Sequence, residues 1–469
     1  MKKITLVLCI CLSAGAMISC EDELSQTSTT SKDLSTFMRN EIEVEEYVNA
    51  VYSNLQVDGL YGQYLPALGE IPSDNSFDEV PSNDAGMYGQ LDEFSVTAPN
   101  PVTTTTWREA YRGIQKANVV LSRIGEVTFK DENTRSFRMG EMKFIRALLY
   151  FNLVQLYGDV PLALEETADP NSYFGQGRSS VGSVYDQIKK DLGEAIGVLP
   201  VAAGAPGRVM KTAAQSLLAK VYLTLGDYGN ARIQLDAVVT SQKHGLVDKP
   251  ADVFSISNEN NKEIIFAVQF TSGVNGNTEG SLMYQQFSPS GTQSGAKGHN
   301  LPTKSLYALY SNTDQRKGVY VDLTAAGVPY NKKLTKPATV ITDGGSDVVV
   351  LRYADVLLMF AEAENELHNP TVAAGYLNKV RVRAGLAETT ASTEADLRTA
   401  IDLERRLELV GEGHRWFDLL RTGKAISVMN QWFKDNGRLI TIDQHNLVMP
   451  IPQTQRDTDP TIAQNTGYN

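Results

Sequence analysis

The stretch AAQSLLAKVYLTLGDYGNA, residues 213–231, decides the fold of this chain. Its apolar side chains recur every three or four positions, which is the spacing of one face of an α-helix. Small alanine and serine side chains allow a second helix to approach closely, and Gly226 can end the first helix in a turn. A half-buried strand would need apolar residues at alternate positions, so the period excludes a strand. The stretch therefore predicts two helices joined by a tight turn.

This helix pair resembles a tetratricopeptide repeat, and the same period occurs on both sides of it. Apolar faces of this kind run through residues 107–124, 142–156, 351–367, 371–384, 395–409 and 414–433. We therefore expect a mainly α fold. Its tetratricopeptide-like scaffold of paired helices covers about residues 40–56, 107–243 and 351–434.

Two long segments interrupt the helical pattern, at about residues 57–106 and 244–350. The second contains a short β-like run at residues 264–268 and loops rich in Gly, Ser and Asn. Long loops inside a compact domain usually carry function. We therefore expect these two irregular, β-containing insertions to form the ligand side of a single domain that spans residues 37–469.

The N-terminal residues have the pattern of an exported lipoprotein. Lys2 and Lys3 precede an apolar run, residues 4–18, which is too short for an ordinary membrane-spanning helix. Residues 17–20, Met-Ile-Ser-Cys, resemble a bacterial lipobox, in which cleavage leaves the cysteine as an acylated N-terminus. We expect residues 1–19 to be a signal peptide, Cys20 to carry lipid, and residues 20–36 to form a flexible polar tether.

Four further stretches, in this order, carry a resemblance over nearly all of the remaining chain: residues 140–162, 207–209, 351–363 and 404–419. They are similar to the signatures of the SusD/RagB family of nutrient-binding lipoproteins of Bacteroidetes. Residues 449–452 also fit, although Gln455 stands where the family usually has Glu. The acidic residues after Cys20 resemble the surface-export signal of these lipoproteins.

The resemblance implies a function and a location. A protein of this family is lipid-anchored in the outer membrane and faces the cell exterior. It binds oligosaccharide without cleaving it and delivers it to a SusC-like TonB-dependent transporter. We expect the same here, with no catalysis.

A glycan site needs exposed aromatic rings beside polar side chains, because sugar rings present an apolar face and a rim of hydroxyls. All three tryptophans, Trp107, Trp416 and Trp432, fall on predicted helices, so the platform must consist of Tyr or Phe. The candidate ligand-binding residues of the two insertions are Tyr61, Tyr64, Asp74, Asn75, Phe77, Asp78, Tyr88, Tyr284, Gln285 and Phe287. The absence of a loop tryptophan keeps an oligopeptide open as the alternative ligand.

The charge balance limits the possible partners. The chain has 55 Asp and Glu residues against 43 Lys and Arg, a net charge of −12. Such a surface repels nucleic acid and anionic headgroups, so we exclude a nucleic-acid partner and favour an uncharged or cationic ligand.

Common enzyme signatures are absent from the sequence, among them the Gly-x-Ser-x-Gly elbow, His-Glu-x-x-His and the Walker loop. The five histidines are too widely spaced to form a local metal pair. We therefore predict no catalytic residue, metal site or cofactor, and the sequence does not decide whether calcium is bound. A glycosidase needs only two carboxylates that the fold brings together, so a glycan hydrolase stays as a less favoured alternative.

The charged residues between Glu404 and Arg421 resemble a catalytic centre at first sight. However, Leu407, His414 and Phe417 belong to one helical stripe, which indicates that His414 packs at a helix interface with a hydrogen-bond partner. We expect Arg405, Arg406 and Glu408 to pair along and between helices and to fix their geometry.

Overall fold

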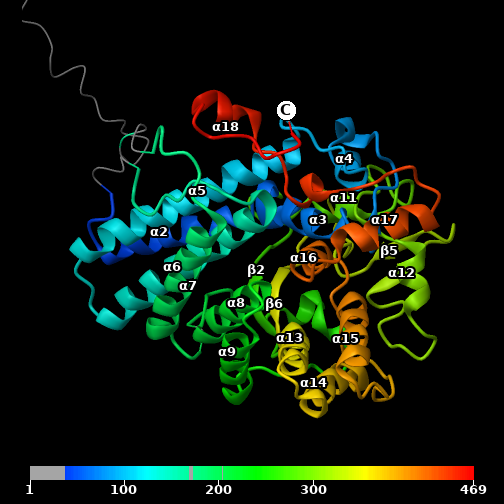
Figure 1. The fold of residues 1–469 in the computed structure, drawn as a ribbon. Helices are drawn as coiled ribbons and strands as arrows, with labels where there is room; N and C mark the ends of the chain where they lie inside the picture. Colours follow the sequence, from blue (N-terminus) through cyan, green and yellow to red (C-terminus); the bar gives the residue numbers. More distant parts are fainter. Residues whose placement is uncertain (1–36, 168, 170–172, 203, 469) are drawn as a thin grey trace, which may run out of the picture.

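The computed structural model describes residues 37–167, 169, 173–202 and 204–468. The predicted signal peptide, Cys20 and the predicted tether lie outside the described residues. The described part is mainly helical, as predicted, and its three sheets have two strands each (Figure 1). None of the helices in this part combines the length and the apolar character that a membrane crossing requires.

The N-terminal half of the scaffold consists of paired helices. They are α2 (Glu41–Asn54), α5 (Pro101–Arg123), α6 (Glu132–Tyr157), α7 (Val181–Val198), α8 (Lys211–Thr224) and α9 (Tyr228–Thr240), with a short turn η5 (Ile124–Glu126) after α5. α6 packs against both α5 and α7, and α8 packs against α9. The predicted turn between α8 and α9 contains Gly226 at φ +72°, a left-handed conformation that glycine adopts without steric cost.

Helix α5 begins earlier than the predicted start at Trp107. The side chain of Asn100 accepts hydrogen bonds from the backbone N–H groups of Val102 and Thr103, and Pro101 occupies the first helical position. An asparagine cap followed by proline is a strong helix start, and it moves six further residues from the expected loop into the helix.

The C-terminal half contains the second group of paired helices. They are α13 (Tyr353–Glu366), α14 (Pro370–Arg383), α15 (Glu394–Glu408), α16 (Arg415–Arg421), α17 (Ala425–Asp435) and α18 (Gln453–Thr458), with η7 (Gln444–Leu447) before α18. The expected single helix over residues 414–433 was wrong, because Gly423 at φ +66° separates α16 from α17. The main apolar core lies between α5, α6, α7 and α8 and extends to α13, and a smaller one lies between α13, α14 and α15.

The first insertion is more helical than its sequence suggests. It contains η3 (Asp58–Gly62), α3 (Tyr64–Glu70), β1 (Ser76–Phe77), η4 (Asn83–Gly86) and α4 (Gly89–Asp92). The second insertion contains α10 (Pro250–Val253), η6 (Ile256–Asn258), β2 (Ile264–Val268), α11 (Met283–Phe287), β3 (Leu301–Pro302), α12 (Lys304–Leu309), β4 (Val321–Leu323) and β5 (Pro329–Asn331). The predicted strand at residues 264–268 is confirmed.

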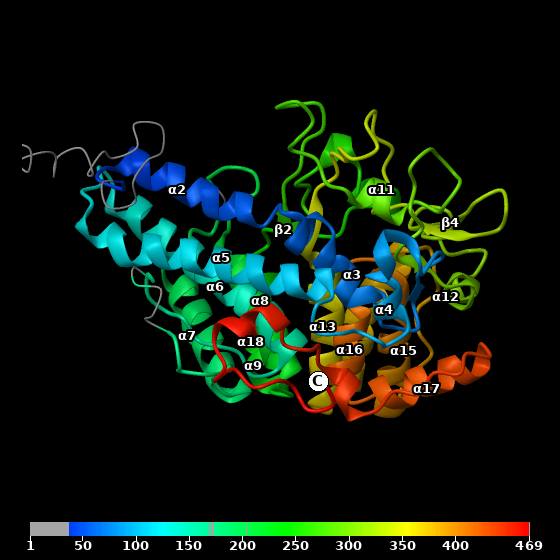
Figure 2. The ribbon, with the colours of Figure 1, turned by 90° about the horizontal axis from the view of Figure 1, so that it is seen from above.

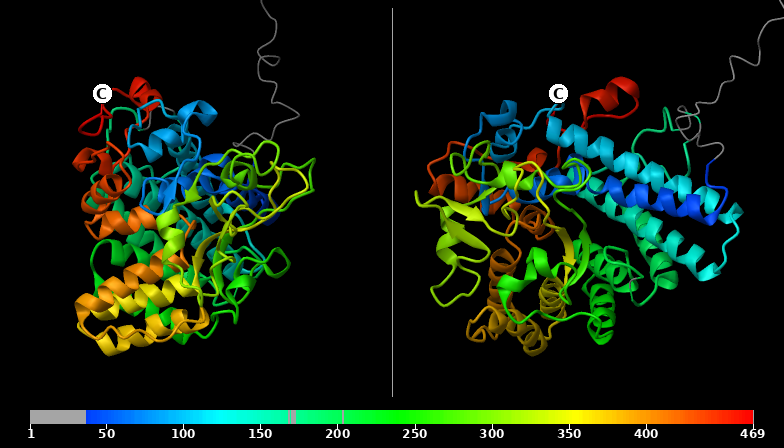
Figure 3. Two further views of the ribbon diagram at one scale, coloured as in Figure 1. Left: turned by 90° about the vertical axis from the view of Figure 1, so that its right-hand side faces the viewer. Right: turned by 180° about the vertical axis from the view of Figure 1, so that it is seen from behind.

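Two antiparallel strand pairs connect these segments. β1 pairs with β3, which joins the first insertion to the second. β2 pairs with β6 (Val348–Arg352), which leads directly into α13 and so ties the second insertion to the scaffold. Figure 2 places α3, α4 and α11 at the same end of the molecule, and the rear view in Figure 3 shows the blue first insertion beside the yellow-green second one. The fold therefore brings the two predicted ligand segments together.

Candidate ligand-binding site

Buried ion pairs fasten the first insertion to the C-terminal helices. Arg415 Nε donates to Asp74 Oδ1 at 2.8 Å, and Arg406 Nη2 lies 2.8 Å from Asp74 Oδ2. Arg406 Nε also donates to Asn75 Oδ1 at 2.9 Å. Burial favours the neutral acid, but the two guanidinium groups outweigh it and lower the pKa of Asp74. Asp74 and Asn75 are thus fully engaged with α15 and α16.

A buried histidine joins the two insertions. His299 Nδ1 lies 2.9 Å from Asp78 Oδ1, and His299 Nε2 lies 3.1 Å from Asp84 Oδ2. Lys297 Nζ donates to Asp84 Oδ1 at 2.7 Å. We call Asp78, Asp84, Lys297 and His299 the His299 joint.

The Tyr88 ring stacks on this joint. Its centroid lies 4.2 Å from that of His299, and its hydroxyl donates to Gln63 Oε1 at 2.8 Å. Because Tyr88 is completely buried, it packs the two insertions together.

Further hydrogen bonds, each with at least one backbone group, reinforce the joint. Glu79 N donates to Gly298 O at 2.9 Å, and Asn83 Nδ2 donates to Lys297 O at 2.9 Å. In the other direction, Ser290 N donates to Glu79 Oε2 at 2.7 Å. The segments around β1 and β3 therefore form one unit, although more than two hundred residues separate them in the sequence.

Six of the ten predicted ligand residues are buried and serve as packing or pairing groups: Tyr61, Asp74, Asn75, Asp78, Tyr88 and Phe287. The Tyr61 hydroxyl accepts from Asn152 Nδ2 at 3.1 Å, and burial raises the pKa of Tyr61. An aromatic platform needs an accessible ring face, which the buried rings Tyr61, Tyr88 and Phe287 lack in this conformation. We therefore do not propose ligand contact for these six residues.

The other four predicted residues, Tyr64, Phe77, Tyr284 and Gln285, are partly exposed. The Tyr64 and Tyr88 rings are in edge-to-face contact, with their centroids 6.1 Å apart. The Tyr284 hydroxyl donates to Gln293 Oε1 at 2.5 Å, which fixes that ring.

Asp84 is a further surface residue that the sequence analysis missed. Its side chain is 22% exposed. Burial and then the charges of Asp58 and Asp84 raise the pKa of Tyr64. We call Tyr64, Phe77, Asp84, Tyr284 and Gln285 the ligand-side surface. It combines aromatic rings with a carboxylate and an amide.

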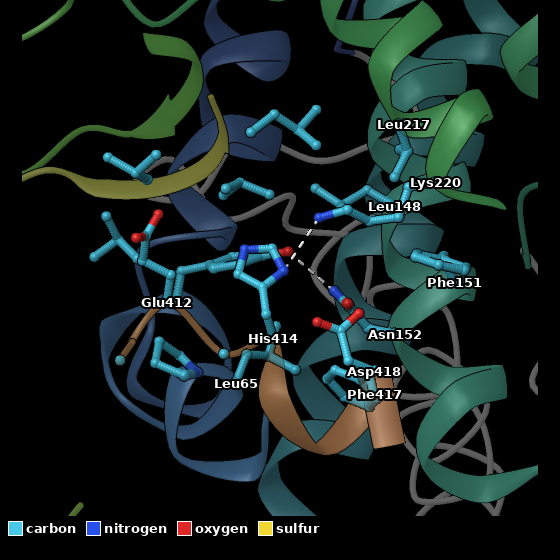
Figure 4. A pocket seen from close by; sticks show the side chains of 18 of the residues that line it. Leu65, Leu148, Phe151, Asn152, Leu217, Lys220, Glu412, His414, Phe417 and Asp418 are labelled. Atoms are coloured by element: carbon cyan, nitrogen blue, oxygen red, sulfur yellow. Dashed lines mark hydrogen bonds between the residues drawn. The ribbon is translucent and has the colours of Figure 1, made fainter. Parts of the chain in front are cut away.

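A separate internal cavity of about 100 Å³ lies between α6, α8, β6 and α16. Figure 4 shows His414 pointing into it among apolar side chains such as Leu65 and Leu148. Ligand pockets usually have volumes of about 300–1,000 Å³, so this cavity is too small for an oligosaccharide.

His414 packs where α16 meets α8, as predicted. Its Nδ1 accepts from Lys220 Nζ at 3.3 Å, and Lys220 also pairs with Asp355 at 2.8 Å. Burial and the Lys220 charge lower the pKa of His414 to about 4. The ring is therefore neutral at neutral pH.

Two glutamates at the end of α15 form a buried network with three arginines, which we call the core charge network: Arg316, Arg352, Arg383, Glu404 and Glu408. Arg352 Nη1 donates to Glu408 Oε1 at 2.7 Å, Arg316 Nη1 donates to Glu408 Oε2 at 3.0 Å, and Arg383 also pairs with Glu408. Although burial favours the neutral acid, these three arginines hold the pKa of Glu408 well below its usual range. The structural interpretation of this segment is confirmed.

The three tryptophans belong to scaffold helices. Trp107 and Trp416 are buried in α5 and α16, and Trp432 is partly exposed on α17. Trp107 lines a pocket of about 420 Å³, and Trp432 lines one of about 340 Å³. Among the described residues, no group of three or more His, Cys, Asp and Glu side chains is arranged to hold a metal ion.

Two family models match the chain. The model described as "SusD family" matches residues 320–468, and the model described as "Starch-binding associating with outer membrane" matches residues 27–223. A SusD-like protein of Formosa agariphila is 28% identical, and the alignment covers 96% of this chain and 97% of that protein. A second SusD-like protein of the same species is 26% identical, with 100% and 99% covered.

Solved structures agree with these matches. A structure described as a laminarin-binding SusD-like protein has a TM-score of 0.80 and 29% identity, covering 92% of this chain and 100% of the other. A SusD superfamily protein from Parabacteroides distasonis has a TM-score of 0.79 and 25% identity, with 91% and 99% covered. Sequence and fold thus agree over nearly the whole length, and this chain belongs to the SusD/RagB family.

Proposed function

We propose that this chain binds an oligosaccharide on its ligand-side surface, at the outer face of the outer membrane, and delivers it uncleaved to a SusC-like TonB-dependent transporter. The observation that carries the proposal is the union of the two insertions, whose partly exposed residues include aromatic rings, a carboxylate and an amide. A relative with the same fold and 29% identity is described as laminarin-binding, so β-glucans are the first ligands to test.

The chemistry of the ligand-side surface suits an uncharged sugar. Tyr64, Phe77 and Tyr284 offer ring surface for the C–H face of a pyranose, and Asp84 and Gln285 offer acceptors and a donor for its hydroxyls. The net charge of −12 disfavours acidic ligands. These features support a neutral oligosaccharide more than an anionic one.

Calorimetry and affinity electrophoresis of the mature protein test the proposal. The panel contains laminarin, laminari-oligosaccharides, starch, xylan, mannan and a mixture of oligopeptides. We expect saturable binding to at least one glycan and no release of reducing ends on long incubation. Binding to peptides alone would show that the ligand is a peptide. Release of reducing ends would identify a hydrolase. Binding to neither glycans nor peptides would favour a purely structural role.

The proposed anchor has its own test. A lipid on Cys20 and the polar segment behind it would hold the binder at high effective concentration beside its transporter. Cys20→Ala protein is therefore expected to bind glycan normally in vitro but not to support growth on that glycan. The transporter partner is tested by co-purification of a TonB-dependent receptor with the wild-type lipoprotein from solubilised membranes.

A further inference from the structure

Both ring nitrogens of His299 face carboxylates. His299 is completely buried, with Nδ1 at 2.9 Å from Asp78 Oδ1 and Nε2 at 3.1 Å from Asp84 Oδ2. An ionised carboxylate only accepts hydrogen bonds, and a neutral imidazole carries one N–H. Only the imidazolium can donate to both partners at once. The geometry is therefore that of a cation held between two anions.

The remaining groups around the ring are compatible with this charge. Lys297 pairs with the other oxygen of Asp84 at 2.7 Å, and the Tyr88 ring stacks on the imidazole. Glu79 lies against Gly298, and its carboxylate accepts from Ser290 N. Beyond Asp78, Asp92 of α4 pairs with Arg438 at 2.9 Å.

Asp78 depends on His299 more than on any other side chain. Its Oδ1 also accepts from Val80 N at 3.2 Å, but its Oδ2 is buried and has no hydrogen-bond partner within the described residues. Burial of a carboxylate with an unpaired oxygen costs free energy that the facing imidazolium offsets. Without a proton on His299, this carboxylate would lose its only charged side-chain partner.

Asp84 depends on the joint for its backbone conformation. Asp84 and Ala85 adopt left-handed φ angles of +49° and +56°, followed by Gly86 at +76°. The left-handed backbone conformation is unfavourable for alanine, so contacts with the surrounding residues must stabilise this turn. Although burial opposes it, hydrogen bonds from Lys297 and His299 lower the pKa of Asp84. The same bonds fix its carboxylate at the ligand-side surface.

We propose that His299 is a positioning residue of the ligand-side surface: as an imidazolium, it fixes Asp84 directly and supports Tyr64 through the stacked Tyr88 ring. The inference rests on the proposed function, because it assigns how that surface is held in its binding geometry. Loss of the proton leaves one carboxylate facing a nitrogen lone pair, which repels it and releases the strained turn. Replacement of His299 by a residue that cannot donate to both carboxylates therefore lowers glycan affinity.

The experiment measures glycan affinity of wild type, His299→Gln and Asp84→Asn by calorimetry at one pH. His299→Gln is expected to bind about tenfold more weakly than wild type, the effect of one charge-assisted hydrogen bond. Asp84→Asn removes the carboxylate that faces His299 Nε2, so it is expected to weaken binding to a similar extent.

His368→Asn is the matched control. His368 is exposed, pairs with Glu394 at 2.8 Å and has a positive φ that asparagine tolerates, so this variant should keep the wild-type affinity. Equal glycan affinities of wild type and His299→Gln would overturn the proposal.

A second readout needs no ligand. Nitrogen-15 spectra of histidine-labelled protein, assigned with His299→Gln, should show a ring protonated on both nitrogens at neutral pH. A neutral ring there would overturn the proposal. If no glycan binds at all, the proposed function fails, while these spectra and hydrogen exchange of residues 83–86 in His299→Gln still decide whether the charged ring holds the turn.

Discussion

The core charge network and the His299 joint are both clusters of opposite charges. Each contains one buried atom without a hydrogen-bond partner within the described residues, Arg383 Nε and Asp78 Oδ2, but the clusters differ in exposure and in backbone geometry. In the core charge network, the Glu408 carboxylate contacts three arginines, and no member of the cluster is exposed. In the His299 joint, Asp78 Oδ2 has no partner within the described residues, Asp84 is partly exposed, and the turn that carries it is strained.

This difference distinguishes the helical scaffold, which contains the core charge network, from the proposed binding site, which contains the His299 joint. A network without an exposed member fixes helices in place and offers no group to a ligand. Strain and unpaired polar atoms at a partly open surface are typical of places where a protein maintains a special geometry for binding. The number of charges in a stretch of sequence is therefore a poor guide to function, and their exposure in the folded protein is a better one.

The largest expected effect tests the core charge network. Glu408→Ala leaves three buried guanidinium groups without their common acceptor, and removal of one partner from a buried pair costs about 3–5 kcal/mol. We expect the free energy of unfolding, measured in urea, to fall by about this amount. Glu388→Ala, at an exposed position near the end of α14, should change it little. Equal effects of the two substitutions would contradict the structural role of the network.

Tyr88→Ala tests the packing of the His299 joint. Removal of a buried aromatic ring costs about 3–5 kcal/mol in a rigid core, and we expect about 3 kcal/mol here because a surface loop can relax. Tyr88→Phe keeps the stacking on His299 and loses only the hydrogen bond to Gln63, so about 1 kcal/mol is expected. Urea unfolding of both variants provides the comparison. An undestabilised Tyr88→Ala protein would show that Tyr88 does not hold the insertions together.

The scaffold was predictable because its signals are local. The period of the apolar residues and Gly226 lie within one stretch, and they specified α8, α9 and the turn between them correctly. The errors in helix boundaries occurred where a single residue determines whether a helix begins or ends. The Asn100 cap lengthened α5, and Gly423 divided α16 from α17, although the apolar stripe runs through both positions.

The ligand side was only partly predictable because its contacts are not local. Tyr61 and Tyr88 were selected as loop aromatics, but helical turns in the insertion direct both rings inward. The pairing of β1 with β3, and of Asp78 with His299, joins segments with no shared local pattern. Asp84 lies in an Asn-Asp-Ala-Gly turn that its composition could have indicated, whereas His299 had no local signal at all.

His414 offers a contrast with His299, because it is a buried histidine kept neutral. Its pKa, lowered from 6.5 to about 4, means that the unfolded chain binds a proton there more readily than the folded chain. Its contribution to stability is therefore complete above pH 6.5 and is lost as pH falls toward 4, up to about 3 kcal/mol. Other groups titrate in the same range, so the measurement is the difference in acid sensitivity between wild type and His414→Gln. We expect the variant to be less sensitive, and equal sensitivity would contradict a buried neutral ring.

The smallest expected effect is on binding and leaves the fold intact. Tyr64 is partly exposed, so Tyr64→Ala should remove a stacking surface worth about 1 kcal/mol, a loss of about fivefold in glycan affinity, while Tm changes little. Tyr376→Ala is the matched control, because that ring is also partly exposed but stacks on Phe360 in the scaffold. Calorimetry should find weaker binding only for Tyr64→Ala. Together with Tyr88→Ala, this result would assign different roles to two tyrosines in edge-to-face contact: Tyr88 would hold the insertion and Tyr64 would contact the ligand. Unchanged affinity for Tyr64→Ala would move the site away from this ring, toward Tyr284 and the second insertion.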